Sequence, residues 1–345
     1  MNNSKKIFVL LAVAAIIMAL IYGQSIIIPF VLAVLFWFII RTIKLGLLKI
    51  KFISKIPRSI VSIFSTLVFL SFLVLIVTMV TKNIQQLSEA MPEYEKNVNT
   101  FTEYINETFD INLEETIGDY SSDMDFGGIL SDIFSALTGL FGDAFMVLLY
   151  LLFLLIEEPT FGRKLTRMYP DKTRYSQVRG IVDKIDHMIR SYLSLKTVVS
   201  LMTGALSFIA LWIIGVDAPL FWAFLIFILN FIPTIGSLIA TLFPAIFATL
   251  QFGDVNPAIW VLVVVGAIQL IVGNLVEPRL VGSSLNISPL VVFLTLALWG
   301  LIWGITGMLL SVPITVILII ILAEFPSSRP LAILLSQKGN IGHKK

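Results

Sequence analysis

Cysteine is absent from the sequence, histidine occurs twice, and only 13% of the 345 residues are charged. Without cysteine the chain can form no disulfide, no thiolate metal site and no cysteine nucleophile. His187 and His343 lie outside the apolar runs, so a histidine-ligated metal centre, which needs several converging ligands, is not expected. Soluble domains carry about 25% charged residues. The low charge therefore excludes an ordinary soluble globular protein.

The motifs of common enzyme classes are also absent. The sequence has no GxxxxGK[ST] loop to cradle phosphates, no HExxH and no GxSxG. No histidine lies in an apolar run, where it could act as a base, and the basic residues do not form the folded basic surface that nucleic-acid binding requires. We therefore expect no enzyme, no cofactor, no bound metal and no nucleic-acid partner.

Apolar residues are abundant, at 57% of the chain. They gather in runs suited to membrane segments, which need about 20 such residues each. The runs cover about 7–22, 26–40, 59–81, 133–156, 198–214, 218–252, 257–275 and 287–323. The first resembles a signal peptide, but no small-x-small site follows it and another run begins at once, so we expect an uncleaved helix. The sequence predicts an all-α, polytopic helical membrane protein with about eight membrane segments.

The charges between the runs indicate orientation. The stretch 41–58 holds six basic residues and no acid, and 157–197 holds nine basic residues against five acids. The stretch 82–142 holds twelve acids against two lysines. Because lysine and arginine accumulate on the cytoplasmic side, both termini, 41–58 and 157–197 are expected inside and the acidic stretch outside.

This pattern predicts a division of the chain into six parts. They are three transmembrane helices in 1–81, an acidic extracytoplasmic helical segment 82–132, a transmembrane helix 133–156, a basic cytoplasmic amphipathic helix 157–197, a transport region 198–323 and a cytoplasmic tail 324–345. In the acidic segment, apolar residues from Ile84 to Ile105 recur every three or four positions, and Pro92 is expected to start or kink that helix. Its apolar seam would pack on a neighbouring helix or form an oligomer contact.

Two of the apolar runs are interrupted. The run 218–252 is broken by Pro233–Gly236, and its arms, 219–231 and 237–252, reach only about 20–24 Å of the roughly 30 Å hydrocarbon core. The run 287–323 is broken at Gly300–Gly304. The two runs also align, with Pro219 opposite Pro289, Asn230 opposite Gly300 and Gly236 within one position of Gly307. Paired interrupted segments of opposite orientation indicate the binding region of a transporter. Re-entrant hairpins and spanning hairpins with close glycine packing both fit.

A charged junction lies between these two runs. Glu277 and Arg279 are the only charged residues between Asp254 and Glu324, and Pro278 is expected to end the preceding helix with its last carbonyls free. The junction is either an interfacial ion pair or a place to hold a substrate or coupling ion. Asp143 is the one acid in its apolar run, which fits either a proton relay or a position near the outer interface.

The candidate transport path consists of the polar, proline and glycine residues of both tips and of the junction. These are Asn230, Pro233, Thr234, Gly236, Ser237, Asn274, Glu277, Pro278, Arg279, Gly304, Thr306 and Gly307. Asp143 and Glu277 are the candidate proton or ion relays.

Four local patterns resemble those of the autoinducer-2 exporter family of bacterial membrane proteins, and the resemblance covers about 7–325. The patterns are Ile232–Gly236, Glu277–Gly282, Asn286–Leu290 and Trp303–Met308 followed by Val312-Pro313. Thr234 and Ser237 stand where the family often has an aromatic residue and a proline, and Ser194-Leu195 stand where it often has Gly-Gln.

The resemblance implies a multi-pass secondary transporter of the bacterial inner membrane. Its substrate would be a small polar solute such as the quorum-sensing signal autoinducer-2, or a cation exchanged for protons by antiport. The resemblance also implies a homo-oligomer, with a pentamer among the assemblies it allows. On the residues alone, a membrane scaffold or assembly factor and an ion channel remain alternatives.

Overall fold

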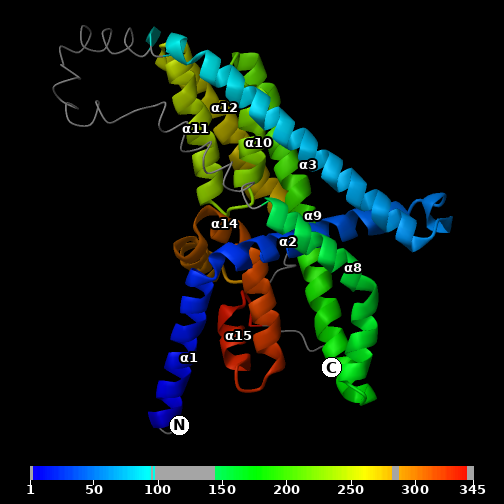
Figure 1. The fold of residues 1–345 in the computed structure, drawn as a ribbon. Coiled ribbons are helices and arrows are strands. Elements are labelled where there is room, and N and C mark those ends of the chain that lie inside the picture. Colours follow the sequence, from blue (N-terminus) through cyan, green and yellow to red (C-terminus); the bar gives the residue numbers. More distant parts are fainter. Residues whose placement is uncertain (1–2, 95, 98–143, 282–286, 340–345) are drawn as a thin grey trace. The chain divides into compact units, whose positions relative to one another are not determined.

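The computed structural model describes residues 3–94, 96–97, 144–281 and 287–339. In these residues all regular secondary structure is helical, apart from one isolated antiparallel bridge between Ile287 and Ser336. The longer helices are α1 (Asn3–Tyr22), α2 (Gln24–Leu48), α3 (Arg58–Glu89), α8 (Ala144–Met168), α9 (Lys172–Ile214), α10 (Pro219–Leu229), α11 (Ile235–Phe252), α12 (Val255–Ile271) and α14 (Pro289–Glu324) (Figure 1). Short helical turns are η1 (Ile53–Lys55), η2 (Val272–Val276), α13 (Glu277–Val281) and α15 (Arg329–Leu335).

Seven helical stretches of the described residues are long and apolar enough to cross a membrane. They are α2, α3, α8, α9, α11, the continuous stretch Val255–Leu280 and α14. The predicted fold class is thus confirmed: the chain is an all-α, multi-pass membrane protein. With eleven residues, α10 reaches only about 16 Å and is too short to cross the hydrocarbon core.

The chain divides into two compact units. Unit 1 consists of Met1–Thr66, Gly142–Ser194 and Ser283–Lys345, and unit 2 consists of Leu67–Phe141 and Leu195–Gly282. The unit boundaries at 66/67 and 194/195 fall inside α3 and α9. Each unit is described by itself below.

Several helices run further than the apolar runs that predicted them. Helix α2 continues through the first eight residues of the basic stretch 41–58, and α8 continues past Ile156 to Met168. The predicted boundary at 197/198 is not a break, because α9 is one helix of 43 residues. Lysine, arginine and glutamate are good helix formers, so a change from polar to apolar composition need not end a helix.

The acidic segment is described only at its start. Helix α3 ends at Glu89, Ala90 forms a turn, and helical structure resumes at Met91 with Pro92 in its first turn. Pro92 therefore starts a helical stretch, which was one of the two outcomes expected from the sequence. Proline is tolerated there because N–H groups in the first turn of a helix have no partner within the helix. The seam beyond Asn97, residues 133–143 of the predicted membrane helix, and Asp143 lie outside the described residues.

The core of unit 1 surrounds a charged cluster. Asp186 on α9, 8% exposed, accepts hydrogen bonds from Arg41 Nη1 at 2.9 Å and from Arg190 Nη2 at 2.5 Å. On α8, Glu158 accepts one from Trp37 Nε1 at 3.1 Å. Apolar residues of α2, α9 and α14 pack beside this cluster. The charges predicted to share one membrane side thus pair with one another.

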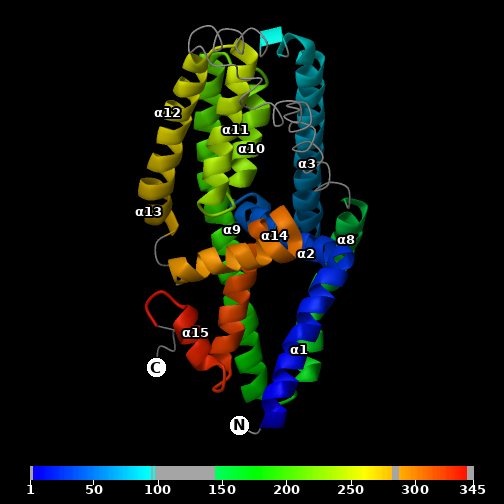
Figure 2. The ribbon, with the colours of Figure 1, turned by 90° about the vertical axis from the view of Figure 1, so that its left-hand side faces the viewer.

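Unit 2 packs the carboxyl-terminal part of α9 with α10, α11 and α12. Helices α10, α11 and α12 lie side by side in both views (Figures 1 and 2). At Gly204 of α9 an added Cβ would lie 3.0 Å from the Ala223 carbonyl oxygen, so the small residue allows α9 and α10 to pack closely. Trp222 and Phe247, at 1% and 2% exposure, form the aromatic core of this unit.

Candidate functional site

The first interrupted run forms a helical hairpin in unit 2. Helix α10 ends at Leu229 and α11 begins at Ile235, close to the predicted arms. Gly236 is buried in the first turn of α11, where an added Cβ would lie 1.8 Å from the Leu229 carbonyl oxygen. Backbone of the two arms therefore meets at a distance that only glycine permits.

The second interrupted run, in unit 1, has the same construction. Helix α14 is broken by non-helical backbone at Trp303 and by Gly304, whose φ is 59°. Gly307 is buried after this break, and its added Cβ would lie 1.9 Å from the Trp299 carbonyl oxygen. The next contacts also correspond, because the Ile232 Cβ would lie 2.9 Å from the first glycine's Cβ and the Trp303 Cβ 3.0 Å from the second's. The glycines aligned from the sequence thus occupy equivalent positions.

The tip of the unit 2 hairpin has strained backbone and exposed polar groups. Thr234 has φ 61° and ψ −56°, a conformation that a β-branched residue rarely adopts. Its side chain is exposed, and its carbonyl oxygen accepts a hydrogen bond from Ser237 Oγ at 2.8 Å. The Ser237 carbonyl in turn accepts from Thr241 Oγ1 and, at 3.4 Å, from Gln269 Nε2 of α12. Pro233 is half-buried in the tip.

At the charged junction, the expectation that Pro278 ends the helix is wrong. Helix α12 passes into the π-helical turn η2 and continues as α13 to Val281, with Pro278 second in α13. Within η2 the Glu277 N–H donates to the Val272 carbonyl, five residues earlier. A π-turn widens the helix and changes its hydrogen-bond pattern, which accommodates a residue that has no N–H to donate.

Glu277 pairs with Lys196 of α9 across unit 2. Lys196 Nζ lies 2.6 Å from Glu277 Oε1, and their side chains are 6% and 27% exposed. The neighbouring residues Asn274, Pro278 and Arg279 are exposed. A buried charge is costly unless it is paired, so each member of this pair depends on the other.

The end of the first hairpin reaches the same face of α9. Asn230, 8% exposed, donates from Nδ2 to Ser200 Oγ at 3.0 Å. Lys196 and Ser200 are four residues apart on one helix, so their side chains are neighbours. The structure therefore brings the junction residue Glu277 and the tip residue Asn230 to adjacent positions on α9.

Sequence reasoning missed Lys196, Ser200 and Gln269. Lys196 was counted among the basic residues of the cytoplasmic stretch, although it lies within a helix that continues into the membrane. The available signal was the spacing of polar residues from Lys196 to Ser207 on an otherwise apolar helix. The candidate residues Gly304, Thr306 and Gly307 belong to unit 1, whereas the candidate residues of the first interrupted run and of the junction belong to unit 2.

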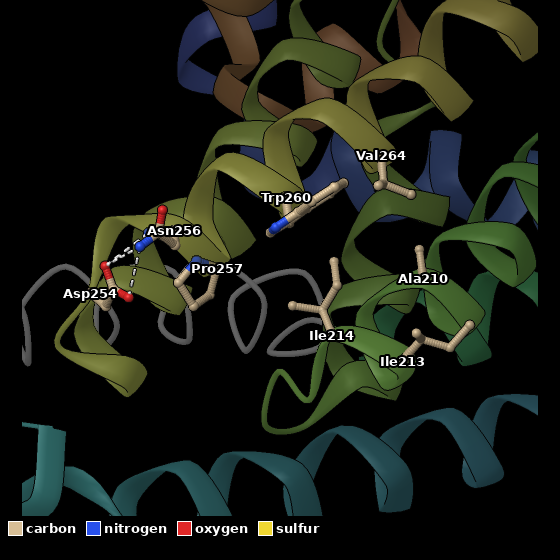
Figure 3. Close-up of a pocket in the computed structure, with 8 residues that line it drawn as sticks. All are labelled: Ala210, Ile213, Ile214, Asp254, Asn256, Pro257, Trp260 and Val264. Atoms are coloured by element: carbon tan, nitrogen blue, oxygen red, sulfur yellow. Dashed lines mark hydrogen bonds between the residues drawn. The ribbon is translucent and has the colours of Figure 1, made fainter.

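A separate pocket of about 430 Å³ lies between α9 and α12 (Figure 3). Its walls are mainly apolar, with Trp260 and Ile213 among them. Asp254 and Asn256, at one end, are hydrogen-bonded to each other. None of the candidate path residues lines this pocket.

Comparison with known proteins identifies the family. The family model described as "AI-2E family transporter" matches residues 9–327. The chain belongs to the AI-2E transporter family. It is 30% identical over 341 residues to the "AI-2 transport protein TqsA" of Escherichia coli (strain K12), a match that covers 97% of this chain and 96% of that protein. It is also 30% identical to a "Putative transport protein" of Haemophilus influenzae, with 97% of both chains covered.

A third relative has a higher sequence identity over a shorter region. This "Putative transport protein" of Borreliella burgdorferi is 39% identical over 207 residues, which is 58% of this chain and 56% of that one. Family and relatives thus agree on a membrane transporter and point away from an enzyme.

Proposed function

We propose that this AI-2E family member is a secondary transporter for a small polar solute such as autoinducer-2, or for a cation exchanged for protons. The observation that carries the proposal is the pair of equivalent helix breaks, each with a buried glycine packed against a backbone carbonyl. Interrupted helices of this kind place polar backbone inside the membrane, which is tolerated where it is buried in protein or lines a water-filled cavity. The name of the Escherichia coli relative supports autoinducer-2 as the first solute to test.

In this mechanism each tip offers polar groups to the solute. Asn230, Thr234, Ser237 and Thr306 supply side-chain hydrogen bonds, and the open backbone around Gly304 supplies carbonyls. Glu277 pairs with Lys196, one turn of α9 away from the Ser200–Asn230 contact, which makes it the proposed site for a coupling proton or cation. Rocking of one part of the molecule against another would then expose the solute to each side in turn.

The direct test is a flux assay with purified protein in liposomes. Uptake of labelled autoinducer-2 is compared with sodium and proton movement under imposed gradients. Saturable flux of one of these that depends on a gradient supports the proposal. Flux that never saturates would indicate an ion channel, and no flux of any of the three would contradict this substrate range.

The tips can be tested on a chain that has no natural cysteine. Thr234→Cys and Thr306→Cys should both react with a membrane-impermeant thiol reagent, and added substrate should slow the reaction. If neither position reacts from either side of the membrane, the tips do not line a path for solute.

The sidedness and assembly belong to the same proposal. The chain is proposed to lie in a bacterial inner membrane with both termini cytoplasmic, since its basic stretches favour that orientation. It is further proposed to be a homo-oligomer, a pentamer being one such assembly. Light scattering of the protein in detergent gives the subunit number.

A further inference from the structure

Helix α9 carries a buried polar stripe inside unit 2. Lys196, Ser200, Thr203 and Ser207 are spaced by four, three and four residues, which places them on one face. Their exposures are 5%, 0%, 1% and 0%. The opposite face is apolar and exposed, as Val198, Leu201 and Leu206 show with 53%, 61% and 42%. This part of α9 therefore turns its polar side inward, the reverse of a helix in a water-soluble protein.

The polar groups of the stripe are only partly satisfied. Lys196 pairs with Glu277, Ser200 accepts a hydrogen bond from Asn230, and Thr203 donates to the Val199 carbonyl. In the part of the chain that the structure describes, Ser207 Oγ has no hydrogen-bond partner, and neither has Trp222 Nε1 on α10. Both atoms are fully buried, and buried polar atoms in proteins are almost always paired with protein or with ordered water.

The residues that carry these two unpaired atoms belong to facing turns of α9 and α10 by their register. Helices α9 and α10 run antiparallel, with Ser200 opposite Asn230 and Gly204 opposite Ala223 and Phe227. Continuing this register by one turn brings Ser207 opposite the turn of α10 that holds Trp222. A hydroxyl that accepts and an indole N–H that donates suit a bridging water molecule, since such a site needs several polar partners.

We propose that water enters unit 2 along this face of α9, between the Lys196–Glu277 ion pair and the level of Ser207 and Trp222, and that Lys196 is the group that exchanges protons with it. The path spans eleven residues, or about 16 Å of helix. The hydroxyls of the stripe can relay protons between water molecules. The proton role rests on the proposed transport function, whereas the hydration does not.

The hydration is tested by cysteine labelling, which needs no transport. Ser200→Cys and Ser207→Cys are treated with aminoethyl methanethiosulfonate in proteoliposomes. Val261→Cys on α12 is the matched control, because it is equally buried at 0% but lies in an apolar seam with Ala258 and Val265. Since the reacting species is the thiolate, which forms only in water, both serine positions should react at least about tenfold faster than the control. Serine positions that react no faster than Val261→Cys would overturn the path, whatever the solute flux.

The proton role is tested with Lys196→Arg. Arginine keeps the positive charge and the pair with Glu277 but does not release its proton, so the fold is retained. We expect solute-driven proton movement, read with a pH-sensitive dye inside the liposomes, to fall at least about tenfold per solute moved. Lys172→Arg, the same substitution at an exposed position of α9, is the control and should keep the wild-type ratio.

The two experiments test the hydrated path and the role of Lys196 separately. An unchanged proton-to-solute ratio in Lys196→Arg would overturn the assignment of Lys196, even if labelling supports the hydrated path. A wild-type protein that moves no solute would contradict the proposed function, and the labelling result would still decide the hydration. Lys196→Met, which leaves Glu277 unpaired, is expected to lower expression or thermal stability rather than the ratio alone.

Discussion

At the scale of single residues, Gly236 and Gly307 matter because of what they lack. Each brings its Cα so close to a carbonyl of the preceding arm that any Cβ would overlap it. The neighbouring atom is backbone in both cases, so no side chain can rotate away. Gly273, in η2, has nothing within 4 Å of an added Cβ and shows that a glycine in this region need not be tightly packed.

The first prediction concerns these glycines. Gly236→Ala and Gly307→Ala should each destabilise the protein by about 1–3 kcal/mol, because an overpacked site forces the backbone to shift. Gly236→Val should abolish flux. Gly273→Ala is the control and should keep both stability and flux. Thermal unfolding in detergent and liposome flux are the measurements, and a folded Gly236→Val protein with normal flux would remove this tip from the mechanism.

The second prediction concerns Thr234. Its positive φ costs about 1–3 kcal/mol in a residue with a Cβ, whereas glycine in its place costs about 0.5–1 kcal/mol of backbone entropy. Thr234→Gly should therefore raise the melting temperature slightly, while Thr234→Val should not. A lower melting temperature for the glycine variant would mean that the threonine side chain stabilises the tip.

The residue scale also explains what the sequence could not predict. The correspondence of Gly236 and Gly307 could be predicted because the two apolar runs align, and a shared spacing can be read directly from the sequence. Lys196 was not found, because a lysine beside a basic stretch reads as part of that stretch. Its burial depends on the ion pair with Glu277, 81 residues later. No local sequence pattern predicts a contact between residues so far apart in the chain.

At the scale of elements, breaks were predicted better than ends. The breaks at 230–234 and at Trp303–Gly304 follow from proline and glycine, whose backbone preferences are intrinsic. The extensions of α2, α8 and α9 were missed because the residues beyond each apolar run are themselves good helix formers. The expectation for Pro278 was wrong because the energetic cost of a proline in a helix depends on the turn before it. Here that turn is η2, which is π-helical rather than α-helical.

The start of the acidic segment, which belongs to unit 2, is tied to the rest of that unit by polar contacts. Tyr94 donates to Asp217 Oδ2 at 2.8 Å and packs edge-on against Phe247. Asn97 Nδ2 donates to the Gln251 carbonyl at 2.6 Å. Burial, and then the hydrogen bond and charge of Asp217, raise the pKa of Tyr94 above its ordinary value. The tyrosine is thus held in its neutral, donating form.

The third prediction follows from this raised pKa. A group whose pKa is raised by folding contributes stability that is complete below its unfolded pKa, about 10 for tyrosine, and that is lost as pH rises through the folded value. Wild-type thermal stability should therefore fall above about pH 10, and Tyr94→Phe should show a smaller fall because it cannot ionise. At neutral pH, Tyr94→Phe should cost about 1 kcal/mol for the lost hydrogen bond. Parallel pH curves for the two proteins would contradict the assignment.

At the scale of the whole molecule, the distribution of charge predicts sidedness. The described charges of 41–58 and 157–197 include Arg41, Lys44, Glu158 and Asp186, which pair with one another in unit 1. Side chains from separate helices that form ion pairs lie at the same depth in the membrane. The pairing therefore supports one of the assignments made from charge counts, that these two stretches share a side.

The fourth prediction tests that sidedness. Cysteines placed at Lys51 and Lys172 should react with an impermeant reagent only when it is applied from the cytoplasmic side. Cysteines placed at Glu93 should react only from the opposite side. The cysteine-free background makes each signal unambiguous. Labelling of Lys51→Cys and Lys172→Cys from opposite sides would contradict the topology.

The π-turn η2 also bears on how the family's sequences should be compared. A π-turn accommodates one residue more than the α-helical turn it replaces, while the helices on either side keep their facing. A relative one residue shorter should therefore show its alignment gap within 272–276 and still direct its equivalent of Glu277 toward α9. Gaps that cluster at this position in an alignment would mark the turn as an inherited insertion, and gaps scattered along α12 would not.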